Sequence, residues 1–260
     1  MLFDQAASLP PAFWLLAITA TVLLGLAKAG FPGTVTNLGV PLIAIVVAPP
    51  FAAAVLLPIL LAIDAIGLVV FRGRYDARSL KLLLPGALLG MALGWLLFDW
   101  VDPRWIRVLI GVEAVLFAVD RLRVVRRERA GREEPSPPLP SVPRGLWWGG
   151  LSGFTCFISH AGGPPLMHFL LPQRLDKMQL VGTTVVYFAA VNFGKLVPYA
   201  QLGLLDLSNV AVSLLLLPAV PVGYFIGYRL LRAVDMRQFN LITAWLLLAT
   251  GVKLIYDGFF

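Results

Sequence analysis

Apolar residues occur along this chain in long runs separated by short polar stretches. Several runs reach the length of about 20 residues that a helix needs to cross the hydrocarbon core of a membrane, and others are shorter. The runs cover residues 12–29, 34–48, 51–71, 80–98, 105–119, 146–159, 178–200, 208–228 and 239–256. This pattern predicts an all-α integral membrane protein that crosses the bilayer several times.

Two of these apolar stretches are interrupted by glycine and proline. The first interruption is Lys28-Ala29-Gly30-Phe31-Pro32-Gly33, and the second is His160-Ala161-Gly162-Gly163-Pro164-Pro165. Such residues remove backbone donors and prevent a continuous helix. Within a membrane, a break of this kind is tolerated only where it is buried in protein or lines a polar cavity. We predict that the two breaks form the two halves of one substrate site.

The two halves of the chain are related by a repeat. Pro85-x4-Gly90-x3-Gly94 recurs in the second half as Pro218-x4-Gly223-x3-Gly227, and the two breaks are separated by almost the same interval as the two motifs. We predict an N-terminal repeat at 1–122, a linker at 123–145 and a C-terminal repeat at 146–260. Each repeat would hold a helix–break–helix hairpin and three transmembrane helices. The glycines of the recurring motif are expected to serve close helix packing.

Basic residues predict how the chain is oriented in the membrane. Four of them lie between Arg72 and Lys81, and seven arginines lie between Arg121 and Arg144 in the Arg- and Pro-rich linker. Cytoplasmic loops carry such an excess of positive charge. The loop around 229–238 is basic as well, although its counterpart in the first repeat, 99–104, falls on the outer side. The repeats are therefore expected to have inverted topology, with the basic loops on the cytoplasmic side.

Composition agrees with a membrane location and excludes several function classes. The 260 residues are 59% hydrophobic and 13% charged, and the net charge of +7 is placed as expected for membrane loops rather than for nucleic-acid binding. The single cysteine, Cys156, excludes an internal disulfide and a multi-cysteine metal site. We find no catalytic constellation and no nucleotide-binding fingerprint. The sequence therefore predicts neither an enzyme nor a bound cofactor or metal, and it indicates no oligomeric state.

The chemistry of the breaks favours an anion as the ligand. A short helix begins after each break, at about 34 and 165, and the N-terminus of a helix presents N–H groups and a positive dipole end. Lys28 and His160 occupy the same position in the two repeats and would add positive charge. The predicted substrate-binding residues are Lys28, Gly30, Gly33, Thr34, Asn37, His160, Gly162, Gly163, Thr183 and Asn192. Purely structural roles remain as alternatives: the Lys28 side chain could extend to the membrane–water interface, His160 could be a structural residue, and the glycines could serve helix packing alone.

A second pair of charged residues is predicted near the centre of the membrane. Asp64 lies in the middle of an apolar run, where an unpaired carboxylate is unfavourable by several kcal/mol. The repeat places Lys195 at the same depth. We predict that Asp64 and Lys195 act in gating or in coupling to protons, with a purely structural pair as the alternative.

At these residues the chain resembles the sulfite exporter TauE/SafE family of bacterial membrane proteins. The resemblance covers both halves and is strongest from Gly149 to Gly251, including the break at His160–Pro165, Gly182-Thr183-Thr184, Asn192-x2-Lys195 and the Pro218 motif. It implies export of sulfite or of an organosulfonate such as sulfoacetate. The first break, with Lys28 and Phe31, is less rich in glycine than is typical of the family, which leaves the substrate open.

Together these observations predict a carrier that works by alternating access and exports a small anion. An inside-negative potential drives an anion outward, so uniport suffices, and proton coupling through Asp64 or His160 stays open. The expected partners are the small anion and membrane lipid. An anion channel, or a transporter of another solute or a cation that uses Asp64, is the alternative.

Overall fold

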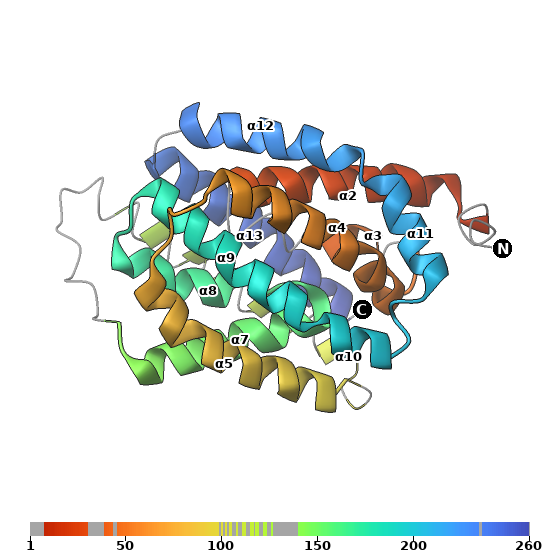
Figure 1. Cartoon of the computed structure of the whole chain (residues 1–260), viewed down its shortest axis with the longest axis horizontal. Helices are drawn as coiled ribbons and strands as arrows, with labels where there is room; N and C mark the ends of the chain where they lie inside the picture. Colours follow the sequence, from red (N-terminus) through yellow and green to blue (C-terminus); the bar gives the residue numbers. More distant parts are fainter. Residues whose placement is uncertain are drawn as a thin grey trace.

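Every secondary-structure element that the structure describes is a helix. The structure, a computed structural model, describes residues 8–30, 39–43, 46–98, scattered positions from 100 to 126, 140–233 and 236–259. The helices are α2 (Pro11–Gly30), α3 (Gly39–Ile43), α4 (Pro49–Val70), α5 (Ala77–Leu96), α7 (Val142–Ser159), α8 (Gly163–Leu170), η2 (Leu171–Gln173), α9 (Lys177–Gly194), α10 (Leu196–Gln201), α11 (Leu207–Leu216), α12 (Ala219–Ala233) and α13 (Met236–Phe259). The all-α fold class is confirmed (Figure 1).

Within the described residues, four helices are long and apolar enough to cross a membrane. They correspond to α2, α4, α5 and the α9–α10 stretch. A fifth span results if α11 and α12, which meet at a bend of 50°, are taken as one bent helix. The apolar run at 105–119 is described at about half of its positions, and each of these is helical.

Helix α7 begins earlier than the sequence suggested. We expected a linker as far as residue 145, but α7 starts at Val142, directly after Ser141. Pro143 lies in its first turn, where proline is favourable because its fixed φ suits a helix and its missing N–H would have no intrahelical partner. The last residues of the proline-rich segment therefore start a helix rather than extending the linker.

Two helix pairs form the most extensive contacts among the described elements, and each joins the first half of the chain to the second. They are α2 with α12 and α5 with α7 (Figure 1). Glycines allow the backbones to approach closely. A Cβ added to Gly90 would lie 1.9 Å from the carbonyl oxygen of Gly150, and a Cβ added to Gly223 would lie 2.1 Å from the carbonyl oxygen of Val22. The predicted packing role of the motif glycines is thus confirmed.

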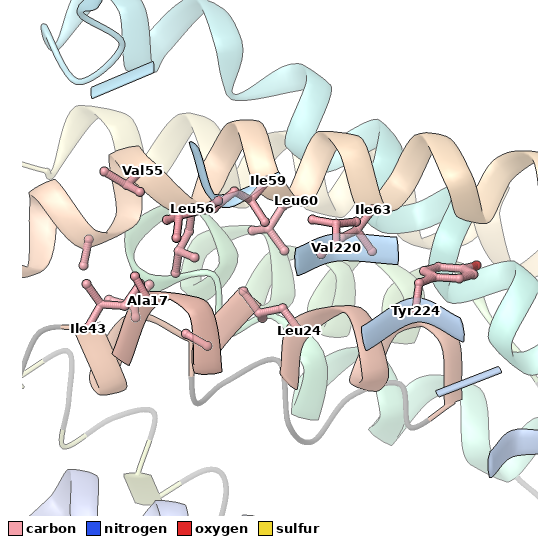
Figure 2. Close-up of a cluster of buried hydrophobic side chains, with 14 of the residues drawn as sticks. Ala17, Leu24, Ile43, Val55, Leu56, Ile59, Leu60, Ile63, Val220 and Tyr224 are labelled. Carbon is pink, nitrogen blue, oxygen red and sulfur yellow. The ribbon is translucent and has the colours of Figure 1, made fainter. Parts of the chain in front are cut away.

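Helices α4 and α9 lie between these two pairs and run antiparallel to each other (Figure 1). Along their contact, Asp64 faces Asn192, Gly67 faces Val185 and Phe71 faces Gly182, so the residue numbers rise on one helix as they fall on the other. On one side of α4 a buried apolar cluster joins it to α2, α3 and α12 (Figure 2). This packing fixes the face of α4 that carries Asp64.

Aspartates start several of the helices by capping their free N–H groups. Asp76 accepts a hydrogen bond from the backbone N–H of Ser79 at the start of α5, Asp176 caps α9, and Asp206 accepts from the N–H of Asn209 at the start of α11. Asp76 precedes the first copy of the proline–glycine motif, and Asp206 precedes the second. Beyond the caps the two segments differ, because α5 continues through Pro85 whereas the chain turns at Leu217 and Pro218 between α11 and α12.

Candidate functional site

The second break is formed by His160, which ends α7 in a left-handed conformation. Its φ and ψ are 56° and 23°, a region that a residue other than glycine seldom adopts. The N–H of His160 bonds to the Cys156 carbonyl at 3.1 Å, and the N–H of Ala161 bonds to the Thr155 carbonyl at 3.4 Å. These bonds satisfy carbonyls at the end of α7. The chain then reverses into α8, which leaves the His160 side chain buried between α4 and the end of α9.

Both ring nitrogens of His160 have a partner. Nε2 lies 3.0 Å from the backbone oxygen of Ala53 on α4, and Nδ1 lies 2.8 Å from Nζ of Lys195. A carbonyl oxygen only accepts hydrogen bonds, so Nε2 carries a proton and donates it. With the Lys195 side chain in its ordinary ammonium form, Nζ donates to the lone pair of Nδ1, and the pair carries one positive charge in total.

The first break supplies a second buried pair. Lys28, in the last turn of α2, donates through Nζ to Oδ1 of Asp64 on α4. The other carboxylate oxygen of Asp64 accepts from Nδ2 of Asn192 at 2.7 Å. The Lys28 ammonium also lies 5.0 Å from the centre of the Phe188 ring. Lys28 and Asp64 thus form an ion pair whose charges cancel.

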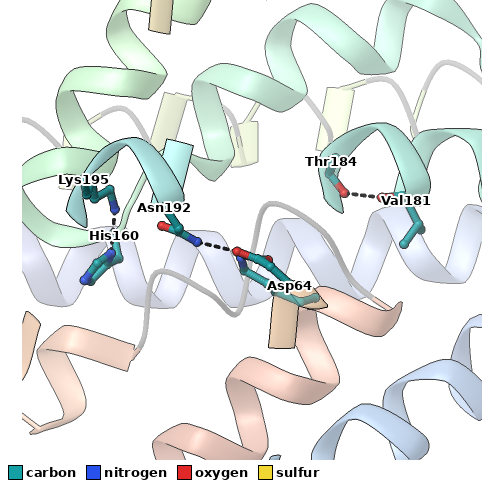
Figure 3. A network of polar contacts seen from close by, with 7 residues as sticks. Asp64, His160, Val181, Thr184, Asn192 and Lys195 are labelled. Carbon is teal, nitrogen blue, oxygen red and sulfur yellow. Dashed lines mark hydrogen bonds and ion pairs between the residues drawn. The ribbon is translucent and has the colours of Figure 1, made fainter. Parts of the chain in front are cut away.

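Asn192 links the two pairs. It precedes Lys195 by three residues, so both side chains leave the same face at the end of α9 (Figure 3). We call Lys28, Asp64, Asn192, His160 and Lys195 the buried polar cluster. Each of them is at least 94% buried, and Lys195 is completely buried.

With both lysines and Asp64 in their ordinary ionised forms and the imidazole neutral, the buried polar cluster carries a net charge of +1. The Lys28–Asp64 pair is neutral, and the His160–Lys195 pair holds one excess proton. Among the described residues, no carboxylate forms an ion pair with Lys195. In addition, the Oδ1 atom of Asn192 is buried and has no hydrogen-bond partner in the described part of the chain. A buried charge without a counterion is unfavourable, so this geometry is suited to a small anion.

The structure pairs the charged residues differently from the sequence prediction. We expected Asp64 to face Lys195, but the lysine that contacts Asp64 is Lys28. Lys28 and His160 were each expected to add positive charge to the substrate site. Instead, the imidazole of His160 holds the ammonium of Lys195, which is the cation of that pair.

The helix N-terminus at the second break offers fewer donors than we expected. Pro164 and Pro165 occupy the first turn of α8 and have no N–H, which leaves the N–H of Gly163 as the donor of that turn. Gly162 packs against α7, where an added Cβ would lie 2.6 Å from the carbonyl oxygen of Ser152. The hydroxyl of Ser152 in turn donates to the Gly162 carbonyl at 2.6 Å. Gly162 is therefore required for packing, whatever its role toward a ligand.

The remaining predicted residues divide into those apart from the cluster and those not described. Thr183 precedes Asn192 by nine residues, about 13 Å along α9, and its hydroxyl accepts from the N–H of Asp76 and donates to the Gln179 carbonyl. It therefore fastens the loop before α5. Gly30 is the last residue of α2. Gly33, Thr34 and Asn37 lie outside the described residues.

The sequence prediction missed the backbone oxygen of Ala53 as a partner of His160. No local signal identifies it, because Pro58 leaves the carbonyl of Ala54, not that of Ala53, without its helical donor. Two carbonyls of α4 bind side chains from the second half of the chain: that of Ala53 binds His160, and that of Val55 accepts from the Ser213 hydroxyl at 2.8 Å. The prediction also gave no structural role to Tyr199. Its hydroxyl donates to the Phe157 carbonyl at 2.6 Å, and its ring centre lies 6.1 Å from that of His160.

Comparison with known protein families places the chain. The family model described as sulfite exporter TauE/SafE matches residues 16–254, which is nearly the whole sequence. The chain belongs to this family, and the resemblance noted from the sequence is confirmed. Comparisons with curated proteins and with solved structures find no match. The family is one of membrane transporters for sulfite-type anions, so the chain is a multi-pass membrane transporter.

Proposed function

We propose that this member of the sulfite exporter family exports a small anion, sulfite or an organosulfonate such as sulfoacetate, and that it binds this anion at the buried polar cluster. The observation that carries the proposal is the uncompensated charge of the His160–Lys195 pair in the part of the chain that the structure describes. An anion beside Lys195 would neutralise that charge, and the dry surroundings would strengthen the attraction.

In the proposed complex, Lys195 supplies the main positive charge and the N–H of Gly163 supplies a backbone donor. His160 positions the Lys195 ammonium through its fixed contact with Ala53. Lys28 and Asn192 face the same region from the Asp64 side. Gly30, Gly33, Thr34 and Asn37 complete the site in this proposal, on the side of the first break.

The transport step that we propose is alternating access between two inverted repeats, residues 1–122 and 146–260, joined by the linker at 123–145. Three observations support it. The α2–α12 contact has its counterpart in α5–α7, each glycine motif packs on the opposite half, and the equivalent helices α4 and α9 are antiparallel. Rocking of one repeat against the other would expose the buried polar cluster first to one side and then to the other.

The proposed direction is outward from the cytoplasm of a bacterium. With the basic loops at 72–81 and 121–145 inside, the chain lies in the inner membrane, whose potential is negative on the cytoplasmic side. Moving one negative charge outward through 100 mV releases about 2.3 kcal/mol. A uniport mechanism is therefore sufficient, and coupling to protons would have to involve Asp64 or His160.

Sulfite efflux from liposomes that contain the purified protein tests this proposal. We expect efflux that saturates with sulfite concentration and shows counterflow. The efflux should also become faster when a potassium diffusion potential makes the liposome interior negative. Lys195→Met should lower the initial rate at least tenfold, because it removes the cation. Lys253→Met is the matched control, since Lys253 is an exposed lysine on α13 that pairs with Asp257, and it should leave the rate unchanged.

Three results would contradict the proposal. Absence of sulfite and sulfoacetate flux in the wild type would exclude the substrate class. Flux that neither saturates nor shows counterflow would indicate a channel in place of a carrier. Equal rates for the Lys195→Met variant and the wild type would remove the buried polar cluster from the site.

A further inference from the structure

From the charge and hydrogen bonding of the buried polar cluster, we infer that the transported species is a singly charged oxyanion with an O–H group of its own, bisulfite rather than sulfite, and that Asp64 sets this preference. The inference rests on the proposed function and specifies the protonation state and charge of its substrate. It depends on two observations, the net charge of the cluster and the unpartnered oxygen of Asn192.

The charge argument follows from the four ionisable side chains of the cluster. Lys28 and Asp64 cancel each other, and His160 and Lys195 share one positive charge. A ligand with one negative charge neutralises the cluster, whereas the complex with a doubly charged ligand would have a net buried charge of −1. Burying an uncompensated charge is strongly unfavourable, so a monoanion should bind better than a dianion of similar size.

Neighbouring groups leave this balance unchanged. The Tyr199 hydroxyl donates to the Phe157 carbonyl and is therefore protonated. Cys156, one turn before His160 on α7, is a free buried cysteine whose thiol lies beside the Lys195 side chain. The segment 31–38, which follows the first break in the sequence, contains no ionisable residue.

The hydrogen-bond argument concerns Asn192. Its Nδ2 donates to the Asp64 carboxylate, which fixes the orientation of the amide and leaves Oδ1 as an acceptor. That oxygen is buried and has no partner among the described residues. A buried acceptor left unsatisfied is unfavourable. Bisulfite, with its single O–H, can donate to Oδ1 while its remaining oxygens face Lys195; sulfite and sulfate have no proton to donate.

The first test needs no variant. Binding of methanesulfonate, sulfate, sulfoacetate and total sulfite to the purified wild-type protein is measured by calorimetry at pH values one unit below and one unit above the pKa of bisulfite. The apparent affinity for total sulfite should fall about tenfold as the bisulfite fraction falls about tenfold. Methanesulfonate carries one charge at both pH values, so its affinity should stay constant, which controls for titration of the protein.

Charge variants provide the second test. In Asp64→Asn the cluster carries a charge of +2, so the affinity ratio of sulfate to methanesulfonate should rise at least tenfold over the wild type. In the double variant Lys28→Gln/Asp64→Asn the charge returns to +1, and the ratio should return to the wild-type value whatever the absolute affinity. Lys253→Met, on the exposed face of α13, should keep the wild-type ratio because it lies outside the cluster.

The outcomes are separable. Sulfite transport with tighter binding of sulfate or sulfoacetate than of methanesulfonate would overturn this inference and leave the proposed function standing. Equal ratios in Asp64→Asn and in the double variant would overturn the role of Asp64. Sulfite affinity that rises or stays constant through the pH change would overturn the choice of bisulfite. Absence of any anion binding or flux would overturn the proposed function itself.

Discussion

The two breaks of this transporter hold pairs of side chains at equivalent positions that differ in charge. Lys28 and His160 each precede an Ala-Gly pair and are 132 residues apart (160 − 28), and their partners Asp64 and Lys195 are 131 residues apart (195 − 64). In both cases a residue at the end of one long helix contacts a residue on, or directly after, the next long helix of its half of the chain. The first pair joins a cation to an anion. The second joins an imidazole to a cation, so the same arrangement gives a neutral pair in one repeat and a charged pair in the other.

This difference indicates a division of roles between the two pairs. The charges of Lys28 and Asp64 compensate each other without any ligand, so we expect that pair to contribute mainly to stability and to the choice of ligand charge. The charge of Lys195 is compensated by no carboxylate in the described part of the chain. A protein that keeps such a group buried gives up stability, and substrate binding is the event that would recover it.

The largest expected effect distinguishes the two pairs by stability. Asp64→Leu leaves the Lys28 ammonium buried without its partner and should destabilise the protein by about 3–5 kcal/mol. Lys195→Leu removes an uncompensated buried charge and should leave the stability unchanged or raise it. Unfolding in mixed micelles, followed by helical circular dichroism, measures both. Lys28→Leu/Asp64→Leu is the control and should recover most of the loss; equal losses in Asp64→Leu and Lys195→Leu would remove the distinction.

A smaller effect is expected at the residue that joins the pairs. Asn192→Leu removes the Nδ2 hydrogen bond to Asp64 and should destabilise the protein by about 1–3 kcal/mol. Asn192→Asp would instead place a second carboxylate beside Asp64 and near Lys195, which makes the net charge of the cluster zero. Binding of methanesulfonate by calorimetry should then be lost in the aspartate variant and retained in part in the leucine variant. Full binding in Asn192→Asp would contradict the charge balance.

The smallest effect sharpens the comparison of the backbones. At His160, glycine should be more stable than alanine by about 1 kcal/mol, because both lose the imidazole but only alanine keeps a Cβ in the left-handed conformation. At Lys28, which is helical, the order should reverse, with glycine less stable than alanine by about 1 kcal/mol. The two glycine–alanine differences in unfolding free energy should therefore have opposite signs, and equal signs would place both residues in the same backbone conformation.

Much of the fold could be predicted from the sequence because it depends on local or repeated signals. Apolar runs indicated the long helices, and the constant spacing of Pro85 and Pro218 with their glycines identified the packing motif. The prolines of α8 were equally visible, and they show that its N-terminus has few donors, which our prediction overlooked. Local chemistry was sufficient for these features.

The bend between α11 and α12 could not be predicted from the proline–glycine motif alone. The capping aspartate precedes the motif proline by nine residues in the first repeat and by twelve in the second. In the first repeat α5 stays continuous and packs along α7. In the second, α11 packs on α4 whereas α12 packs on α2, and one straight helix could not follow both partners. The same proline motif therefore gives a straight helix or a bent one according to what lies beside it.

The sequence alone was enough to predict membrane-spanning helices, two interruptions rich in glycine and proline, and the polar residues Lys28, Asp64, His160, Asn192 and Lys195 within apolar segments. Those properties follow from hydrophobicity and backbone chemistry, which act locally. The partner of each charge depends on the tertiary structure. Lys28 and Lys195 are both buried lysines, and the packing of α2 on α4 and of α7 against the end of α9 brings one to a carboxylate and the other to an imidazole. Contacts between residues distant in sequence thus gave the cluster its charge of +1.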